Sequence, residues 1–335
     1  MQIVFLNTFE KAAEIGGIEG AQLSICEESG LWSVLWLEDR DGQKGKASPE
    51  RWFEGTSWEE MMAAFRHGIA RMMGKGYFPV VDGMLERERN AGGSFYSMLQ
   101  CYGEQHANEE LFQALREWRR KVAAAEKKSA YLIATNRMLW MISAFVPWNE
   151  EELRQIPGWG AARHEAYGSD ILTVTQGVER AAAFPLDWVP EKLDPSFYRA
   201  WLYKQKENKY KSLMESQQEK KKILSILHEE GGLDRIQAEL SLSRRELLLR
   251  IEQLEQEGYD LDPLIERELS AVPDEERKQI WTALEAVGDR YLKPVLQQVY
   301  GEAALDEADR SVEQLYERLR LMRMSYRRSG QGKAV

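Results

Sequence analysis

Few residues of this 335-residue chain are spaced for chemistry. ATP hydrolysis would need the loop Gly-x-x-x-x-Gly-Lys-Ser/Thr, because its amides cradle the phosphates and its hydroxyl binds magnesium. The nearest string is Gly42-Gln43-Lys44-Gly45-Lys46-Ala47, in which the glycines are wrongly spaced and the hydroxyl is missing. The sequence therefore predicts that this chain carries no ATPase motor.

A second string matches the residue pattern of a magnesium-binding motif but lacks the sequence context of that motif. Leu305-Asp306-Glu307-Ala308-Asp309-Arg310 resembles the acidic box of DEAD-type helicases. Such a box ends a buried apolar strand downstream of a phosphate loop, whereas Gly301-Glu302-Ala303-Ala304 precedes it here. We interpret the string as a polar connection between two helices.

Other catalytic patterns are also missing from the sequence. The histidines His67, His106, His164 and His228 are isolated and form no zinc-ligand spacing, and no Gly-x-Ser-x-Gly elbow for acyl transfer occurs. The acids Glu27, Glu28, Asp39 and Asp41 cluster in expected turns, whereas a two-metal nuclease spreads its acids over a larger domain. We predict a protein that is not an enzyme and that binds no metal or cofactor. A nuclease with an unrecognised N-terminal site is the alternative.

Charge limits how this chain could bind nucleic acid. Its net charge is −10, so it cannot neutralise phosphates over its whole surface, and any such binding must use local patches. Two segments qualify, a lysine-rich stretch at residues 204–222 and the C-terminal arginines Arg318, Arg320, Arg323, Arg327 and Arg328. Solvated helix faces are the alternative interpretation of both.

Composition indicates a soluble protein of two or three domains. Hydrophobic residues make up 43% of the chain and charged residues 30%. No apolar run approaches the roughly 18 residues that a membrane span needs, and no signal peptide is evident. Cys26 and Cys101 are far apart, so we expect reduced thiols, a cytoplasmic location and no membrane partner.

The N-terminal residues 1–85 predict a small α+β domain of unknown role. Apolar alternation at 22–27 and 31–37, separated by Glu28-Ser29-Gly30, is typical of a β-hairpin. Ser57-Trp58-Glu59-Glu60 then predicts a helix start. The buried face of that helix would be formed by Met61, Phe65, Ile69 and Met72.

The central segment resembles a known family. The residues that carry the resemblance are 111–119, 130–133, 139–147, Glu152-Leu153-Arg154-Gln155-Ile156-Pro157-Gly158-Trp159-Gly160, Tyr167-Gly168 and Ile171-Leu172. In order and spacing they are similar to the HRDC domain, named for helicases and RNase D. That resemblance implies a helical bundle which in many members binds single-stranded or branched DNA weakly, and in others contacts proteins.

A tight corner in this segment is the first candidate contact with DNA. Gly158 and Gly160 would let backbone N–H groups approach a phosphate, and Trp159 at the tip would stack on a base. Arg163 follows in the next helix. The alternative is that the corner only joins two helices and Trp159 packs on its neighbours.

Residues 233–300 resemble, more weakly, the helix-turn-helix module at the C-terminus of some RecQ-type helicases. A first helix with Leu233, Ile236 and Leu240 is followed by a turn at Ser241-Leu242-Ser243, and Ser243-Arg244-Arg245-Glu246 begins a second helix. The resemblance implies DNA contacts from Arg244, Arg245 and Arg250, which Arg323, Arg327 and Arg328 of the basic C-terminal helix would join. A helical hairpin without DNA contact is the alternative, because glutamates crowd the same helix.

Together these patterns predict a mainly α protein. The expected parts are the α+β domain (1–85), a linker (86–107), the HRDC-like domain (108–178), a hinge with a long polar helix (179–230), the helix-turn-helix-like domain (231–325) and a disordered tail (326–335). We predict a nucleic-acid-binding or helicase-accessory protein that lacks a motor and binds single-stranded or forked DNA weakly. The alternative is a scaffold that docks on a helicase or nuclease without touching DNA.

Overall fold

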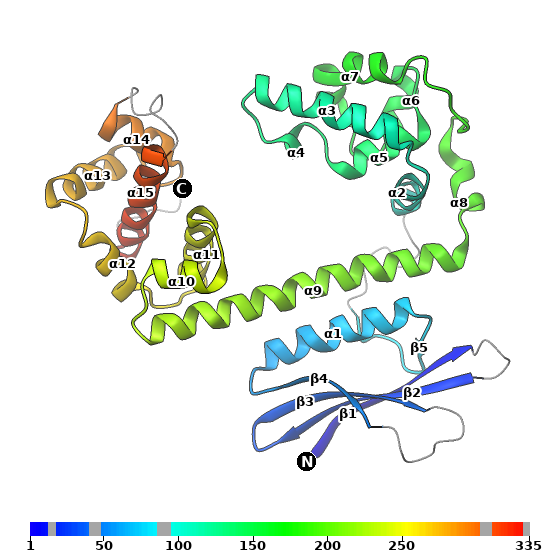
Figure 1. Ribbon diagram of the computed structural model, residues 1–335, viewed down its shortest axis with the longest axis horizontal. Coiled ribbons are helices and arrows are strands. Elements are labelled where there is room, and N and C mark those ends of the chain that lie inside the picture. Colours follow the sequence, from blue (N-terminus) through cyan, green and yellow to red (C-terminus); the bar gives the residue numbers. More distant parts are fainter. Residues whose placement is uncertain (13–17, 40–47, 86–94, 302–309, 331–335) are drawn as a thin grey trace. The chain divides into compact units, whose positions relative to one another are not determined.

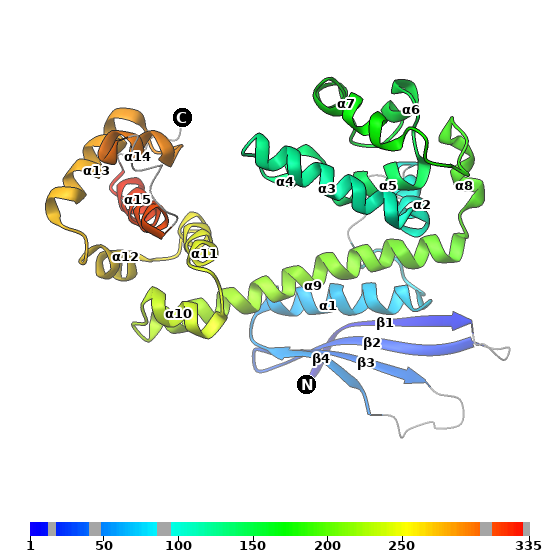
Figure 2. The same ribbon diagram turned by 45° about the horizontal axis from the view of Figure 1, so that its top comes forward.

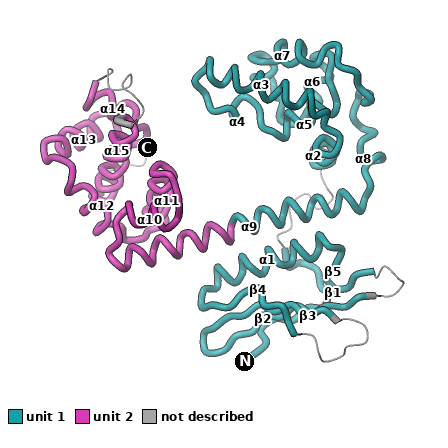
Figure 3. Tube along the Cα trace, in the orientation of Figure 1, with its two compact units in different colours: residues 1–212 teal, residues 213–335 magenta. Residues whose placement is uncertain are grey.

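The computed structural model describes residues 1–12, 18–39, 48–85, 95–301 and 310–330. The chain forms two compact units, residues 1–212 and 213–335 (Figure 3). It is mainly helical, as predicted, with one sheet near the N-terminus. Two strings considered for chemistry, Gly42-Gln43-Lys44-Gly45-Lys46-Ala47 and Leu305-Asp306-Glu307-Ala308-Asp309, lie outside the described residues.

The N-terminal sheet is antiparallel throughout. Its strands are β1 (Gln2–Ala12), β2 (Ile18–Glu28), β3 (Leu31–Asp39), β4 (Glu50–Gly55) and β5 (Phe78–Pro79), in the order β4-β3-β2-β1-β5 (Figure 1). The predicted hairpin is confirmed, with β2 and β3 joined by Ser29-Gly30. These two residues have φ values of 54° and 83°, as a two-residue turn with two left-handed positions requires.

Helix α1 (Trp58–Gly74) covers one face of this sheet (Figure 2). Its predicted start is confirmed, because the Ser57 hydroxyl accepts a hydrogen bond from the Glu60 N–H at 3.3 Å. Met61, Phe65, Ile69 and Met72 are buried as the helical spacing predicted, against a sheet core that includes Phe9 and Trp36.

The central helices enclose a second core. They are α2 (Phe95–His106), α3 (Glu109–Ala125), α4 (Ala130–Ile133), α5 (Asn136–Phe145), α6 (Glu150–Arg154), α7 (Ala161–Thr175), the 3₁₀ turn η1 (Leu186–Trp188) and α8 (Val189–Lys192). The predicted linker is wrong from residue 95 on, because α2 lies there and packs on α5 with Leu99 and Cys101 fully buried. The remainder of that linker, residues 86–94, lies outside the described residues.

The predicted hinge also belongs to this core. Leu186, Val189 and Leu193 are buried against the central helices, so the segment after α7 is part of the folded domain. Its prolines begin helices here, since a missing N–H is tolerated in a first helical turn. Pro190 lies in the first turn of α8, and Pro195 begins α9 (Pro195–His228), which confirms the predicted long polar helix.

The C-terminal unit is helical. It contains α10 (Leu233–Leu240), α11 (Arg244–Gln256), α12 (Asp262–Leu269), α13 (Asp274–Val287), α14 (Leu292–Tyr300) and α15 (Arg310–Arg328). A left-handed Ser241 ends α10, and Ser243 with Glu246 forms a capping box that begins α11. Helix α15 extends to Arg328, so the predicted tail is helical at its start, and residues 331–335 lie outside the described residues.

Candidate nucleic-acid interface

The corner between α6 and α7 is held from both sides. Asn149 caps α6 by accepting a hydrogen bond from the Glu152 N–H at 3.0 Å. Ile156 and Trp159, which are 1% and 3% exposed, anchor the corner in the core. Between them Gly158 has φ +84°, a left-handed conformation that favours glycine. The backbone of the corner is therefore held in one conformation.

The start of α7 offers unsatisfied backbone donors to a ligand. Gly160 is its N-cap and has no side chain that could accept from the N–H groups of the first turn. A Cβ atom built on Gly160 would meet no atom within 4 Å, so the space before the helix is open. These donors and the positive end of the helix dipole favour an anion at this position.

Trp159 does not have the position predicted for a stacking residue. Its side chain is buried and its Nε1 atom has no hydrogen-bond partner among the described residues. The ring therefore offers no face to a base in this conformation. The alternative interpretation, packing on neighbours, is the arrangement that the structure has, because the apolar indole stabilises the corner more by burial than by exposure.

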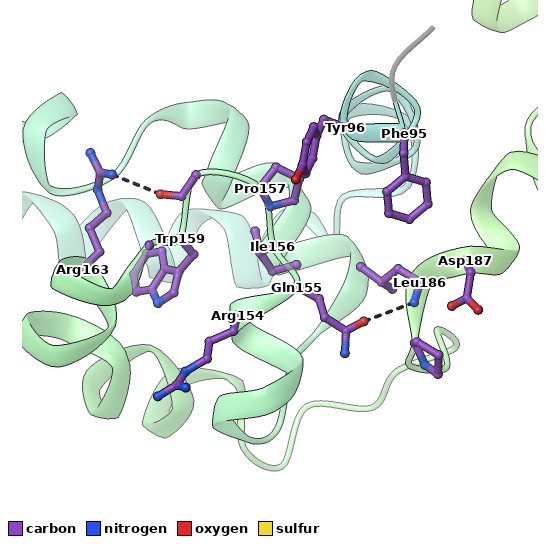
Figure 4. Close-up of a pocket in the computed structure, with 13 residues that line it drawn as sticks. Phe95, Tyr96, Arg154, Gln155, Ile156, Pro157, Trp159, Arg163, Leu186 and Asp187 are labelled. Atoms are coloured by element: carbon purple, nitrogen blue, oxygen red, sulfur yellow. Dashed lines mark hydrogen bonds between the residues drawn. The ribbon is translucent and has the colours of Figure 1, made fainter. Parts of the chain in front are cut away.

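Two other aromatic residues lie exposed beside the corner. Phe95 and Tyr96, at the first turn of α2, are 43% and 65% exposed. Figure 4 shows both side chains projecting from α2 towards the corner, where they line an open pocket of about 720 Å³ together with Pro157, Gly158 and Gly160. The sequence prediction missed them because it treated this segment as linker, although a Phe-Tyr pair before an apolar helical pattern was visible.

Arginines surround the same surface. Arg163 donates to the carbonyl oxygens of Gly158 (3.1 Å), Ile133 (3.0 Å) and Leu132 (3.4 Å). These bonds hold the corner and the loop before α5 together. The partners of Arg163 are thus neutral carbonyl groups, which do not cancel its positive charge beside the pocket. Arg154 is 63% exposed at the same pocket.

A second, smaller hollow continues this surface. It has a volume of about 420 Å³ and shares Tyr96, Gly158 and Arg163 with the first pocket, adding Arg137 and the α5 N-cap Thr135. Arg119 of α3 donates to the carbonyl oxygen of Ala134, the residue before Thr135, at 2.7 Å. Burial, followed by repulsion from Arg116 and Arg120, lowers the pKa of Arg119.

Acidic groups reduce the attraction for phosphate. Glu150 lies 3.5 Å from Arg154 and 3.0 Å from His164, and Asp187 lines the far side of the pocket. The net electrostatic attraction of this surface for a phosphate is therefore modest. It fits weak, salt-sensitive binding rather than tight binding.

The arginines predicted in the C-terminal unit are mostly engaged within the protein. Arg244 pairs with Glu317 at 2.7 Å and Asp234 at 2.8 Å, and Arg250 pairs with Glu219 at 2.6 Å. Arg323, Arg327 and Arg328 pair with Glu252, Asp289 and Asp262, respectively. Of the predicted contacts in this unit, Arg245 is exposed and has no ion pair within the described ranges. Most of the arginines that the sequence prediction assigned to DNA contacts therefore form ion pairs within the protein.

Comparison with known proteins supports the family predicted for the central domain. The family model of the HRDC domain matches residues 108–175. These residues form an HRDC domain. Over 70 residues the chain is 37% identical to the ATP-dependent DNA helicase UvrD2 of Mycobacterium bovis and of Mycobacterium tuberculosis. The match covers 21% of this chain and 10% of each helicase. No solved structure matches the chain significantly.

The HRDC domain is a helicase- and nuclease-associated module. The corner between α6 and α7 lies within the matched range, whereas Phe95 and Tyr96 precede it. Neither a group of three or more metal-binding side chains nor a helix that could span a membrane occurs among the described residues. Cys26 and Cys101 are free and buried.

Proposed function

We propose that this protein binds single-stranded or forked DNA weakly through its HRDC domain and serves a helicase or nuclease that another chain provides. The observation that carries the proposal is the exposed corner, which combines open helix N-terminal amides, exposed aromatic rings and arginines on one surface. Single-stranded nucleic acid is bound by such pairs of stacking platforms and positive charge. Duplex DNA would present no unstacked base to Tyr96.

The chain itself supplies no motor in this proposal. It spans about a tenth of the length of the mycobacterial helicases that it matches. Their helicase activity is therefore not carried over. We propose an accessory role without enzymatic activity, in which the HRDC domain places the protein on DNA and other surfaces contact a partner.

Binding should depend on Tyr96 and Arg154. We expect Tyr96→Ala to weaken binding to a fluorescent single strand about 5- to 150-fold, because stacking on one base contributes roughly 1–3 kcal/mol. Arg154→Ala should weaken binding less and reduce the slope of log affinity against log salt by about one. Fluorescence anisotropy of the full chain with single-stranded, forked and duplex DNA at increasing salt measures both effects.

Matched controls separate the corner from general effects of the substitutions. Tyr291→Ala removes a tyrosine of similar exposure (63%) from the C-terminal unit. Arg235→Ala removes an arginine that is 46% exposed and, like Arg154, pairs with a glutamate four residues away on its own helix. Both controls should keep the affinity of the unmodified protein. No binding to any DNA at low salt would refute the proposal and favour a scaffold that contacts only proteins.

The helix-turn-helix part of the sequence prediction leads to a different expectation. Because Arg244 is held by three carboxylates, Asp234, Glu268 and Glu317, we expect it to support the fold rather than to contact DNA. Arg245→Ala, which changes an exposed arginine at the start of α11, should then leave DNA affinity within about twofold. A tenfold loss in the same anisotropy assay would instead show that α11 reads DNA.

A further inference from the structure

The first strand of the sheet has one edge that is largely unpaired. Strand β1 pairs with β2 along its length, but on its other edge only Phe9 and Glu10 pair with β5. Just before them, the Val80 N–H donates to the Thr8 carbonyl at 2.8 Å, and the Asn7 side chain bonds both main-chain groups of Val81. Within the described ranges, no strand pairs with residues 2–6 on this edge.

The residues along this edge do not prevent it from pairing with another strand. Ile3, Val4 and Leu6 are 57%, 51% and 55% exposed. No charged side chain and no proline occurs from residue 2 until Glu10, and the N-terminal amino group is engaged by Glu28 at 3.0 Å. Natural sheets usually blunt such an edge with charges, prolines or very short strands, because open N–H and C=O groups recruit another strand.

The opposite edge of the same sheet shows that protection. Strand β4 is 6 residues long and carries Glu50, Arg51 and Glu54. Arg51 and Glu54 form an ion pair with each other, and Arg71 of α1 holds Glu50 at 2.8 Å. The two edges thus differ in length and in charge, and only the β1 edge is suited to pairing.

We propose that the β1 edge pairs with the same edge of a second copy of this chain, antiparallel about a twofold axis near Val4. A twofold contact uses the same patch on both partners, so the patch must not repel itself. Residues 2–6 meet that condition because they are uncharged in a chain whose net charge of −10 opposes self-association elsewhere. The pairing places Gln2 opposite Leu6 and Ile3 opposite Phe5.

The expected dimer is weak. The register of β1 with β2 shifts between Ile3 and Phe5, which marks a bulge, and a bulge locally disrupts pairing and bends the strand. The contact is therefore short. A dimer would carry two HRDC domains, so two DNA contacts could act together on one strand. The pairing itself does not depend on DNA binding.

Sedimentation velocity of the full chain without DNA, from low to high micromolar concentration, tests the dimer. We expect a monomer–dimer equilibrium whose dissociation constant rises at least tenfold in Val4→Lys, since two like charges would then face each other across the axis. Leu6→Lys should also weaken the dimer, since it adds a charge to the edge that each copy must offer for pairing. Leu31→Lys is the control, because Leu31 is also exposed (41%) on a strand but lies in β3, away from this edge.

Hydrogen exchange on the unmodified protein gives a readout that does not need a substitution. Amides within residues 2–6 should exchange more slowly as the protein concentration rises, whereas amides of β4 should not change. A monomer at every concentration, or a dimer that both lysine variants leave intact, would overturn the proposal. Loss of DNA binding with the dimer intact would refute only the proposed function.

Discussion

A fragment limited to residues 108–178 is expected to lack a cooperative fold, whereas a fragment of residues 95–203 is expected to fold. The shorter fragment corresponds to the HRDC-like domain predicted from the sequence and is close to the matched range 108–175. It removes α2 and the segment 182–193, both of which complete the core. The exposed core would then face water.

The size of this effect follows from the buried side chains that are lost. Leu99, Leu186, Val189 and Leu193 are each 7% exposed or less. Full burial of such a side chain contributes about 1.5–3 kcal/mol, so their loss removes about 6–12 kcal/mol, comparable with the whole stability of a domain.

The shorter fragment also loses the close packing of α2 on α5, which lowers its stability further. A Cβ atom on Gly103 would lie only 2.8 Å from the Met141 side chain and 3.0 Å from its Cα atom, so the two helices approach closely at this glycine. In addition, Trp201 of α9 donates to Glu104 of α2 at 2.6 Å, which is why the longer fragment extends to residue 203.

Circular dichroism and urea denaturation of both fragments measure this difference. The longer fragment should unfold in one transition, and the shorter one should show reduced helicity without a transition. In the full chain, Gly103→Val should lower the unfolding midpoint, while Gly160→Ala should change it little because a Cβ there meets open space. Cooperative unfolding of the shorter fragment would contradict the assignment of α2 to the core.

Replacement of Glu252 by alanine is expected to destabilise the C-terminal unit by about 3–5 kcal/mol. Glu252 is 6% exposed and accepts hydrogen bonds from Arg320 at 2.7 Å and from Arg323 of the same helix, α15. The side chains of Arg320 and Arg323 are themselves 18% and 11% exposed. Without the carboxylate, two largely buried arginines would lose the acceptor that they share.

Glu239→Ala is the matched control for Glu252→Ala. Glu239 pairs with Arg235 at 2.9 Å, but both side chains are nearly half exposed, so the pair contributes less than about 1 kcal/mol. In the unit of residues 213–335 the sequence has a single tryptophan, Trp281, which packs edge-on against Tyr326 of α15. Urea denaturation of this unit followed by tryptophan fluorescence measures both variants. Equal effects of the two substitutions would show that the buried network does not hold α15.

Much of the local structure could be predicted from short stretches of sequence. The Ser29-Gly30 turn, the caps at Ser57, Asn149 and Ser243, and the long helix over residues 195–228 all follow from preferences of a few neighbouring residues. The HRDC domain was also predictable, because its separate motifs keep their order and spacing.

The tertiary structure decided which side chains remain free to contact a ligand. Arg244 is taken up by Glu317, which lies 73 residues away in sequence, and Arg323 by Glu252, 71 residues away. A local pattern shows the charge of a residue but not its partner. Burial of Trp159 and exposure of Tyr96 likewise depend on how helices distant in sequence pack. The sequence by itself therefore determined the turn, several helix starts and the family of the central domain. Packing decided that α2 belongs to the core and which surface remains free to bind, because burial and ion pairing arise between segments far apart in the chain.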